Sequence, residues 1–229
     1  MFEWLRGMEN RWRSYSPTKD VRADRGYRYL VSRSPALDVA CGIGRFCAYD
    51  PKNTIGLDWT FESVQQVARE HGNAVVQGDA TSLPFTSDSF EGVYCSDLIE
   101  HLDVCRAMEL LRELGRVLRP GGRLVLSGPL YYDGFWNDFS HVRPYYPKPI
   151  LRYLTTGGGS QRTGQEYPYR FQLKQVVWDY EPWFAGPLLG TERFYRFHAA
   201  LKLLGLWAYS HHVHTWTRNG FTLVLDKTE

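Results

Sequence analysis

The sequence Ala36-Leu37-Asp38-Val39-Ala40-Cys41-Gly42-Ile43-Gly44-Arg45-Phe46 contains an aliphatic run that stops at a short glycine turn. This pattern predicts a strand over 36–41 and a helix over 43–49. Gly42 and Gly44 have no side chains where a ligand would approach backbone N–H groups, and a helix start favours an anionic group. The stretch therefore predicts a strand–loop–helix unit that binds a cofactor.

Two acids follow the glycine turn, and each closes a strand-like run: Asp58 ends 53–58 and Asp79 ends 74–79. In nucleotide-binding α/β folds, an acid about 20 residues after the glycine loop holds the ribose hydroxyls. Asp58 fits that position. A dinucleotide site is disfavoured, because the third position of its glycine pattern falls on Cys47.

The ordered series of segments resembles class I S-adenosylmethionine-dependent methyltransferases. Their first motif, acid-x-small-x-Gly-x-Gly, is matched by Asp38, Ala40, Gly42 and Gly44, with Ala40 in place of the commoner glycine. Roughly residues 34–130 are covered by the resemblance. Further segments that resemble family motifs are Gly56–Asp58, Gly78–Ala80, Leu83–Phe85, Asp88–His101 and Leu114–Pro129.

The resemblance implies that the chain binds S-adenosylmethionine and releases S-adenosylhomocysteine. It implies that Asp58 holds the ribose hydroxyls and that Asp79 meets the adenine amino edge. Asp38 would orient the loop that receives the methionine amino group. The residues expected to line the cofactor site are Asp38, Ala40, Gly42, Gly44, Asp58, Trp59, Asp79, Ala80 and Ser96.

Strand-like and helix-like segments alternate along the chain, which predicts an α/β fold with a doubly wound, mostly parallel seven-stranded sheet. Asn219-Gly220 predicts a C-terminal antiparallel hairpin between 207–217 and 221–227. The other strands are expected over 36–41, 53–58, 73–77, 91–96 and 122–128. The helices are expected over 21–32, 43–49, 60–71, 104–118, 147–155 and 192–205.

The length of 229 residues predicts one domain over 1–229. Its parts are expected to be N-terminal cap helices over 1–33, a cofactor-binding core over 34–130, a substrate lid insertion over 131–192, and a final helix and hairpin over 193–229. The predicted lid is rich in aromatic residues. This composition indicates either a stacking surface for the substrate or a small subsidiary core.

Two histidines are candidates for the catalytic base. His141 follows Asp138 by three residues, and a carboxylate can orient an imidazole that accepts a proton. The segment Asp138-x-x-His141-x-Arg143 resembles a pattern of small-molecule and glycan-modifying methyltransferases. His101, just past the fourth predicted core strand, is the second candidate. The structural alternatives are a hydrogen-bonded clasp that anchors the lid and a solvated histidine at a helix start.

The sequence predicts no metal site. On a strand, His212 and His214 share one face and His211 points away, with no carboxylate nearby in sequence. The cysteines form no Cys-x-x-Cys pair, so neither a disulfide framework nor a zinc site is indicated. Reduced, buried thiols are expected at Cys41, Cys47, Cys95 and Cys105.

Acids and bases are interspersed at a net charge of +2, so the sequence gives no strong nucleic-acid signal. We expect a small-molecule or sugar-like acceptor that is methylated on oxygen. The first alternative is a tRNA or protein methyltransferase, and the second is a non-catalytic scaffold subunit with the cofactor fold. A basic track that would favour RNA could run through Arg143, Lys148, Arg152, Arg162 and Arg170.

A third alternative is an enzyme in peripheral contact with a membrane, suggested by Phe2, Trp4, Trp12 and the apolar segment 194–207. No apolar run approaches the roughly 20 residues of a membrane span. The first residues include an early acid and lack the apolar region of a signal peptide. A cytoplasmic location is therefore expected, and the sequence does not indicate the oligomeric state.

Overall fold

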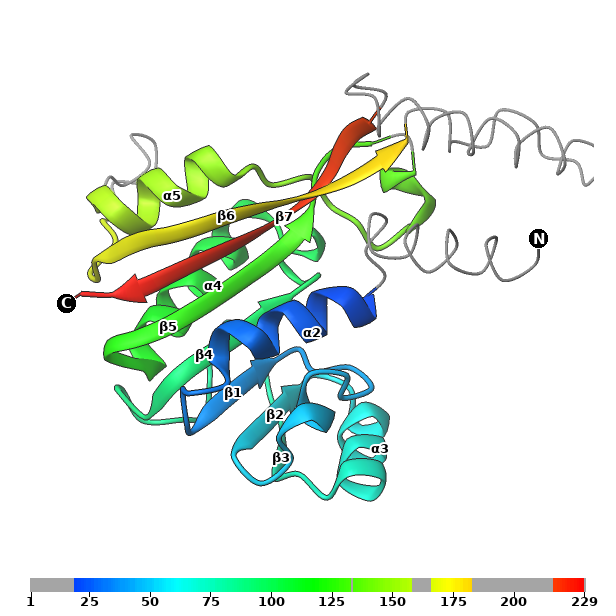
Figure 1. Cartoon of the computed structure of the whole chain (residues 1–229), viewed down its shortest axis with the longest axis vertical. Coiled ribbons are helices and arrows are strands. Elements are labelled where there is room, and N and C mark those ends of the chain that lie inside the picture. Colours follow the sequence, from blue (N-terminus) through cyan, green and yellow to red (C-terminus); the bar gives the residue numbers. More distant parts are fainter. Residues whose placement is uncertain (1–18, 133, 158–165, 183–215, 229) are drawn as a thin grey trace, which may run out of the picture.

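The computed structural model describes residues 19–132, 134–157, 166–182 and 216–228 (Figure 1). Several expectations lie outside these residues: the first part of the N-terminal cap, the helix over 192–205, the strand before residue 216, Arg162, and His211, His212 and His214. Within the described ranges, none of the helices combines the length and the apolar character needed to cross a bilayer.

One seven-stranded sheet forms the centre of the molecule, with the strand order β3-β2-β1-β4-β5-β7-β6 (Figure 1). β1 pairs in parallel with β2 and β4, β2 with β3, and β4 with β5, whereas β7 is antiparallel to both β5 and β6. The predicted α/β fold with a mostly parallel sheet is confirmed. The strands are β1 Ala36–Val39, β2 Thr54–Asp58, β3 Val75–Gln77, β4 Phe90–Ser96, β5 Leu118–Pro129, β6 Phe171–Pro182 and β7 Trp216–Lys227.

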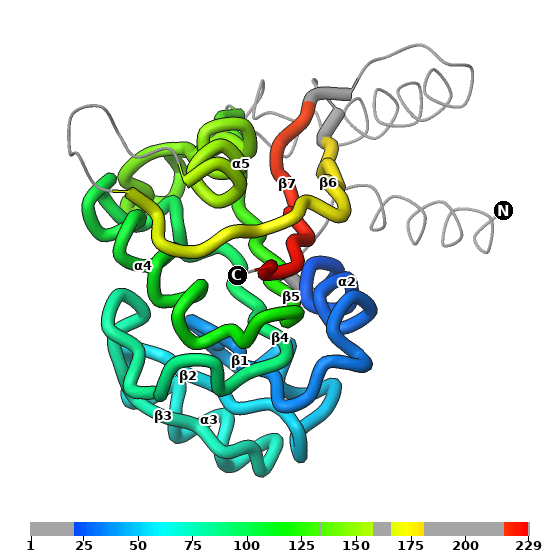
Figure 2. The backbone as a smooth tube through the Cα atoms, turned by 90° about the vertical axis from the view of Figure 1, so that its left-hand side faces the viewer, coloured from blue at the N-terminus to red at the C-terminus, as the bar shows by residue number. Residues whose placement is uncertain are grey.

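Helices cover both faces of the sheet, with α4 and α5 on one side and α2 on the other (Figure 2). Successive strand residues point to opposite faces. Val93 and Cys95 of β4 therefore belong to the main core, while Tyr94 between them packs with Ala23 and Leu30 of α2. The helices are α2 Lys19–Leu30, α3 Phe61–His71, α4 Val104–Val117 and α5 Pro147–Thr156.

Local signals place the ends of these helices close to the predicted positions. Asp103 caps α4, because its side chain accepts the Arg106 N–H at 3.0 Å. α3 follows Thr60 and ends at Gly72, whose φ of +71° is the left-handed conformation typical of a C-terminal glycine. The predicted helices over 60–71, 104–118 and 147–155 are confirmed within one or two residues.

The predicted helix over 43–49 is wrong. Turns follow the glycine loop, and only Cys47–Tyr49 form a short 3-10 helix. Gly42 and Gly44 have φ values of +52° and +77°, which the right-handed helix does not allow. An α-helix N-terminus is therefore not available at this loop to bind an anionic group.

The predicted antiparallel C-terminal strands are confirmed, but the predicted turn at Asn219-Gly220 is wrong. Both residues lie inside the continuous strand β7, which pairs with β6 on one side and β5 on the other. A side chain at Gly220 would lie 2.9 Å from Asp179 Oδ2 and would collide with the Arg22 guanidinium. Close packing, rather than a turn, accounts for this glycine.

The predicted substrate lid over 131–192 is not confirmed as one unit. Its residues 171–182 form the edge strand β6. Tyr153, Tyr167 and Phe171 belong to the main hydrophobic core, and the Tyr167 hydroxyl donates to the Leu111 carbonyl at 3.0 Å. These three aromatics are therefore part of the core, whereas Tyr131, Trp136, Phe139 and Tyr146 of the same segment are exposed.

A buried ionic network joins α2 to the far half of the sheet. The Asp179 side chain is inaccessible to solvent and accepts from Arg22 at 2.9 Å and from Arg25 at 2.7 Å. Arg22 also contacts Asp97 after β4, and Arg25 donates to Thr222 of β7 at 2.9 Å. Burial alone would lower the pKa of Arg22, but Asp97 and Asp179 raise it above its usual value.

Asp179→Ala is expected to lower the free energy of unfolding by about 3–5 kcal/mol, because it leaves the partly buried Arg25 without a carboxylate and Arg22 with Asp97 alone. Urea denaturation measures this change. The matched control is Asp24→Ala, which removes an exposed ion pair to Arg28 on the same helix and should cost about 0.5 kcal/mol or less. Equal effects of the two variants would contradict the role of the network.

Candidate functional site

Asp58, the last residue of β2, ties two neighbouring loops together. Its Oδ2 accepts the Gly42 N–H at 2.8 Å, and its Oδ1 accepts the Thr60 N–H at 2.9 Å. The residue is buried, with 8% of its surface exposed. Each carboxylate oxygen retains a second lone pair, so Asp58 can hold the loop and still accept from ligand hydroxyls.

The two loop glycines serve different purposes. A Cβ at Gly42 would meet no atom within 4 Å, so open space lies in front of this residue. A Cβ at Gly44 would lie 2.8 Å from Val67 of α3, so Gly44 allows close packing. Ala40 has a φ of +59°, a left-handed conformation that costs an alanine about 1–2 kcal/mol.

Asp38 lies beneath the loop rather than on its surface. It is 3% exposed, and the Cys47 thiol donates to its Oδ2 at 3.3 Å. Burial raises its pKa to about 7, although the hydrogen bonds from Cys47 lower it. This position agrees with the predicted role of orienting the loop. The expectation of buried cysteines holds for Cys41, Cys47 and Cys95, whereas Cys105 is exposed.

Asp79 is held by partners that the sequence analysis did not identify. Its carboxylate accepts Arg106 Nη2 at 2.9 and 2.7 Å, as well as the N–H and hydroxyl of Thr81. Partial burial acts to raise its pKa, but the Thr81 hydrogen bonds and the Arg106 charge hold it below the usual value. The adenine contact stays a prediction, and it would use the one acceptor position left on Oδ2.

Three further predicted residues line the same edge of the sheet. The Trp59 side chain is exposed next to Asp58, with 68% of the residue accessible. Ser96 donates to Asp97 Oδ2 at 3.0 Å, and Ala80 packs partly buried against the core. The open space at Gly42, the spare acceptors of Asp58 and this exposed indole fit a nucleoside with a charged tail.

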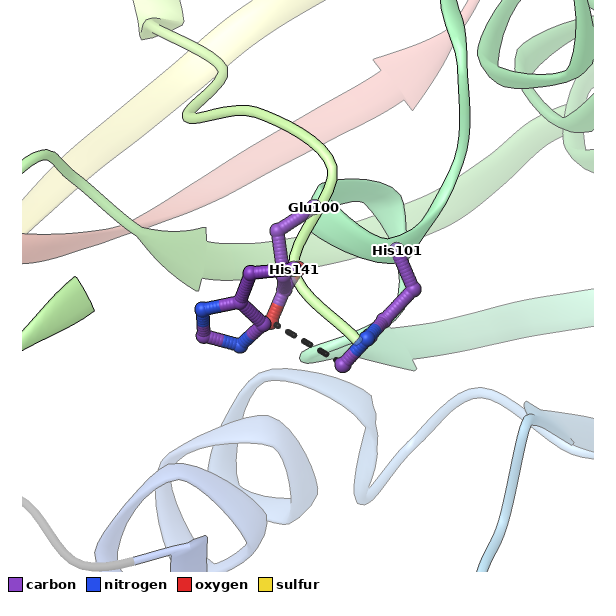
Figure 3. Close-up of side chains that lie close together, drawn as sticks. All are labelled: Glu100, His101 and His141. Atoms are coloured by element: carbon purple, nitrogen blue, oxygen red, sulfur yellow. Dashed lines mark ion pairs between the residues drawn. The ribbon is translucent and has the colours of Figure 1, made fainter. Parts of the chain in front are cut away.

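His101 and His141 lie together, although they come from different segments (Figure 3). His101 is in the 3-10 helix η2 Ile99–His101 after β4, and His141 is in the loop after η3 Phe135–Asn137. Their ring centroids are 4.8 Å apart. The two histidines were predicted as alternative catalytic bases, and the structure brings both to one place.

The hydrogen bonds of each ring fix its tautomer. His141 Nδ1 lies 2.6 Å from the Phe135 carbonyl oxygen, and His101 Nδ1 lies 3.2 Å from that of Ser140. A carbonyl oxygen can only accept, so both Nδ1 atoms carry the proton in the neutral ring. The lone pair is therefore on Nε2 of each histidine.

The predicted Asp138–His141 hydrogen bond is not formed. Asp138 Oδ2 lies 3.9 Å from His141 Nε2, which is longer than a hydrogen bond. Asp138 instead accepts the Ser140 hydroxyl at 2.5 Å, and that oxygen lies 3.0 Å from His101 Nδ1. These Ser140 hydrogen bonds hold the pKa of Asp138 below its usual value.

Glu100 is a site residue that sequence reasoning missed. It is 1% exposed, and its Oε1 lies 4.0 Å from His101 Nε2. The signal was available, because Glu100 directly precedes His101 within the apolar run Leu98-Ile99 and Leu102. Glu100 therefore belongs to the same cluster as the two imidazoles.

Asp58→Ala is expected to weaken S-adenosylmethionine binding at least tenfold, because it removes both the loop anchor and the ribose acceptor. Isothermal titration calorimetry measures the affinity. Glu62→Ala, an exposed carboxylate in the first turn of α3, is the control and should bind like the parent chain. Unchanged affinity in Asp58→Ala, with an intact circular dichroism spectrum, would contradict the assignment.

Asp38→Asn is expected to flatten the pH dependence of stability. The folded pKa of about 7 exceeds the ordinary 3.8, so the folded state keeps a proton that the unfolded chain releases. The free energy of unfolding should therefore fall by about 2 kcal/mol as the pH rises from 5 to 7. Urea titrations at both pH values should show this loss in the parent chain and a smaller one in Asp38→Asn. Equal losses in the parent chain and in Asp38→Asn would contradict this prediction.

Comparisons with known proteins find a methyltransferase domain in part of the chain. Residues 37–126 match the family described as a methyltransferase domain. The chain is 36% identical over 132 residues to O-methyltransferase resE of Aspergillus sclerotiorum, covering 50% of this chain and 49% of that protein. It is 31% identical over 104 residues to the Mus musculus protein named "Probable tRNA methyltransferase 9B", covering 43% of this chain and 23% of that protein. The chain thus spans about half or less of the length of these relatives.

A solved structure agrees with this result. The crystal structure of a SAM dependent methyltransferase from Archaeoglobus fulgidus superimposes with a TM-score of 0.61 at 19% identity, covering 91% of this chain and 92% of that chain. At this identity the likeness concerns the fold. The strand order and the reversed β7 agree with it. Residues 37–126 therefore match the methyltransferase domain family, and the chain has the fold of the class I S-adenosylmethionine-dependent methyltransferases.

Proposed function

We propose that this chain is an S-adenosylmethionine-dependent methyltransferase that methylates an oxygen of a small, hydroxylated or sugar-like acceptor. One observation carries the proposal. The same edge of the sheet holds Asp58 with the open glycine loop and, two strands away, His101 and His141. Two strand spacings are about 10 Å, a distance that a nucleoside with an amino acid tail can span.

The bound cofactor supplies a methyl group on a positively charged sulfur. Asp58 would bind the ribose hydroxyls, and the loop supported by Asp38 would receive the amino acid tail. His141 Nε2, with its lone pair, can accept the proton of the acceptor hydroxyl. Alignment of the acceptor contributes about 7–11 kcal/mol and a general base about 10²- to 10⁴-fold, so positioning is the larger effect.

The charges around the site bear on the choice between a small acceptor and RNA. The Arg170 guanidinium donates to the Tyr167 and Tyr169 carbonyls, so it is engaged within the protein. Arg143 lies 5.1 Å from the centre of the Tyr145 ring. Of the basic track that tRNA would follow, Arg170 is engaged within the protein, whereas Arg143, Lys148 and Arg152 are exposed. The likeness to O-methyltransferase resE supports methylation on oxygen, and the likeness to the mouse tRNA methyltransferase keeps RNA as the second candidate.

The test is release of S-adenosylhomocysteine with a panel of phenols, polyols, sugars and bulk tRNA. We expect turnover with a hydroxylated small molecule and none with tRNA. His141→Ala should lower kcat about 10²- to 10⁴-fold with unchanged cofactor affinity. Asp24→Ala, which removes an exposed ion pair on α2, is the control and should retain activity.

Two outcomes would contradict the proposal. Turnover with tRNA alone would assign the chain to the nucleic-acid alternative. Failure to bind S-adenosylmethionine in calorimetry, with the fold intact, would favour the scaffold alternative.

A further inference from the structure

We propose that Glu100, His101 and His141 bind a divalent transition-metal ion, and that this ion binds the oxygen of the acceptor to be methylated. The second half rests on the proposed function, whereas the ion site stands independently of it. One ligand atom from each of the three side chains lies within 4.8 Å of the others (Figure 3). Two imidazole nitrogens and one carboxylate oxygen suit Mn²⁺, Fe²⁺, Co²⁺ or Zn²⁺.

The second layer of hydrogen bonds orients both histidines as metal ligands. A metal-binding imidazole typically donates its other N–H to a carbonyl or carboxylate, which fixes the ring. His141 does so to the Phe135 carbonyl, and His101 to the Ser140 carbonyl. For His101 the support extends through the Ser140 hydroxyl to Asp138. Both Nε2 atoms are therefore in the form that binds a cation.

Backbone contacts hold the two ligand segments together. The Glu100 carbonyl accepts the N–H groups of Val142 at 2.8 Å and Arg143 at 3.3 Å. The Tyr145 hydroxyl donates to the Leu102 carbonyl at 3.0 Å. Because these bonds flank all three ligands, rotations of side chains alone can close the site around an ion. The site is thus organised before the ion binds.

The three ligand side chains differ in burial, with Glu100 the most buried and His101 the most exposed. The side chain of Glu100 is 1% exposed, that of His141 11% and that of His101 28%. A carboxylate buried this deeply favours nearby cations, and Arg22 already interacts with it electrostatically. Three protein ligands leave coordination positions for water or substrate, and these would lie on the more exposed side, at His101.

An ion at this position changes the chemistry of the acceptor oxygen. A bound cation lowers the pKa of a hydroxyl, so the O–H bond breaks and the proton passes to water. The oxygen lone pair then attacks the methyl carbon, the carbon–sulfur bond breaks, and its electron pair stays on sulfur as a neutral thioether. In this scheme His141 is a ligand rather than a base, since one lone pair cannot do both.

Metal binding is tested first without cofactor or acceptor. The full chain is stripped with EDTA, desalted and titrated with Mn²⁺, and electron paramagnetic resonance reports the unbound ion. We expect one Mn²⁺ per chain, with at least tenfold weaker binding in Glu100→Gln, His101→Ala and His141→Ala. His71→Ala is the control and should bind normally. No stoichiometric binding in the parent chain, or equal binding by all variants, would overturn the proposal.

A second measurement guards against variants that fail to fold. The parent chain loaded with Co²⁺ should show visible absorption bands that change in Glu100→Gln, the variant closest in shape to the parent. If Glu100→Gln shows the same bands as the parent chain, the ligand assignment is overturned.

Methyl-transfer assays distinguish failure of the ion's role from failure of the proposed function. We expect EDTA to abolish methyl transfer to the small acceptor and Mn²⁺ to restore it. Full activity in EDTA with His141→Ala inactive would overturn the ion's role and leave His141 as the base of the proposed methyltransferase. Stoichiometric Mn²⁺ binding in a chain that does not bind S-adenosylmethionine would sustain the ion site and overturn the proposed function.

Discussion

The hydrogen bond from the Gly42 N–H to Asp58 is the contact on which the site depends. It fixes a loop whose backbone is held in left-handed conformations at Ala40, Gly42 and Gly44. Ordering such a loop costs free energy. The hydrogen bond to a charged acceptor offsets about 1.5–3 kcal/mol of this cost. The same carboxylate caps the entry to α3 through Thr60. One side chain thus positions the loop, the helix start and the ribose site.

Buried carboxylates lie along the rest of the sheet edge that holds the glycine loop. Asp38 supports the glycine loop from below, Asp179 joins α2 to β6, and Glu100 lies beside two histidines. Their neighbours differ: Asp38 accepts from a thiol, Asp179 accepts from two guanidinium groups, and Glu100 Oε1 lies 4.0 Å from His101 Nε2. Because an unpaired buried charge is strongly unfavourable, these partners restrict how the strand ends can move. The edge is therefore rigid where the cofactor and acceptor are proposed to meet.

Local signals predicted most of the fold, and long-range contacts account for some of the errors. Gly72 and the spacing of apolar residues in α4 act within a few residues, so α3 and α4 were placed correctly. The wrong helix over 43–49 has a local cause, the positive φ values of Gly42 and Gly44. Asn219-Gly220 has the pattern of a turn, but packing against Asp179 keeps it inside β7. The proximity of His101 and His141 depends on two loops that meet only after folding, and no local pattern encodes it.

The most direct test of the account is hydrogen–deuterium exchange of the full chain with and without S-adenosylhomocysteine. The account predicts slower exchange in the glycine loop over 40–46 and at 58–60, where Asp58 anchors the backbone, with little change in β6. Protection confined to other regions, or none at all at saturating ligand, would contradict a cofactor site at this edge of the sheet.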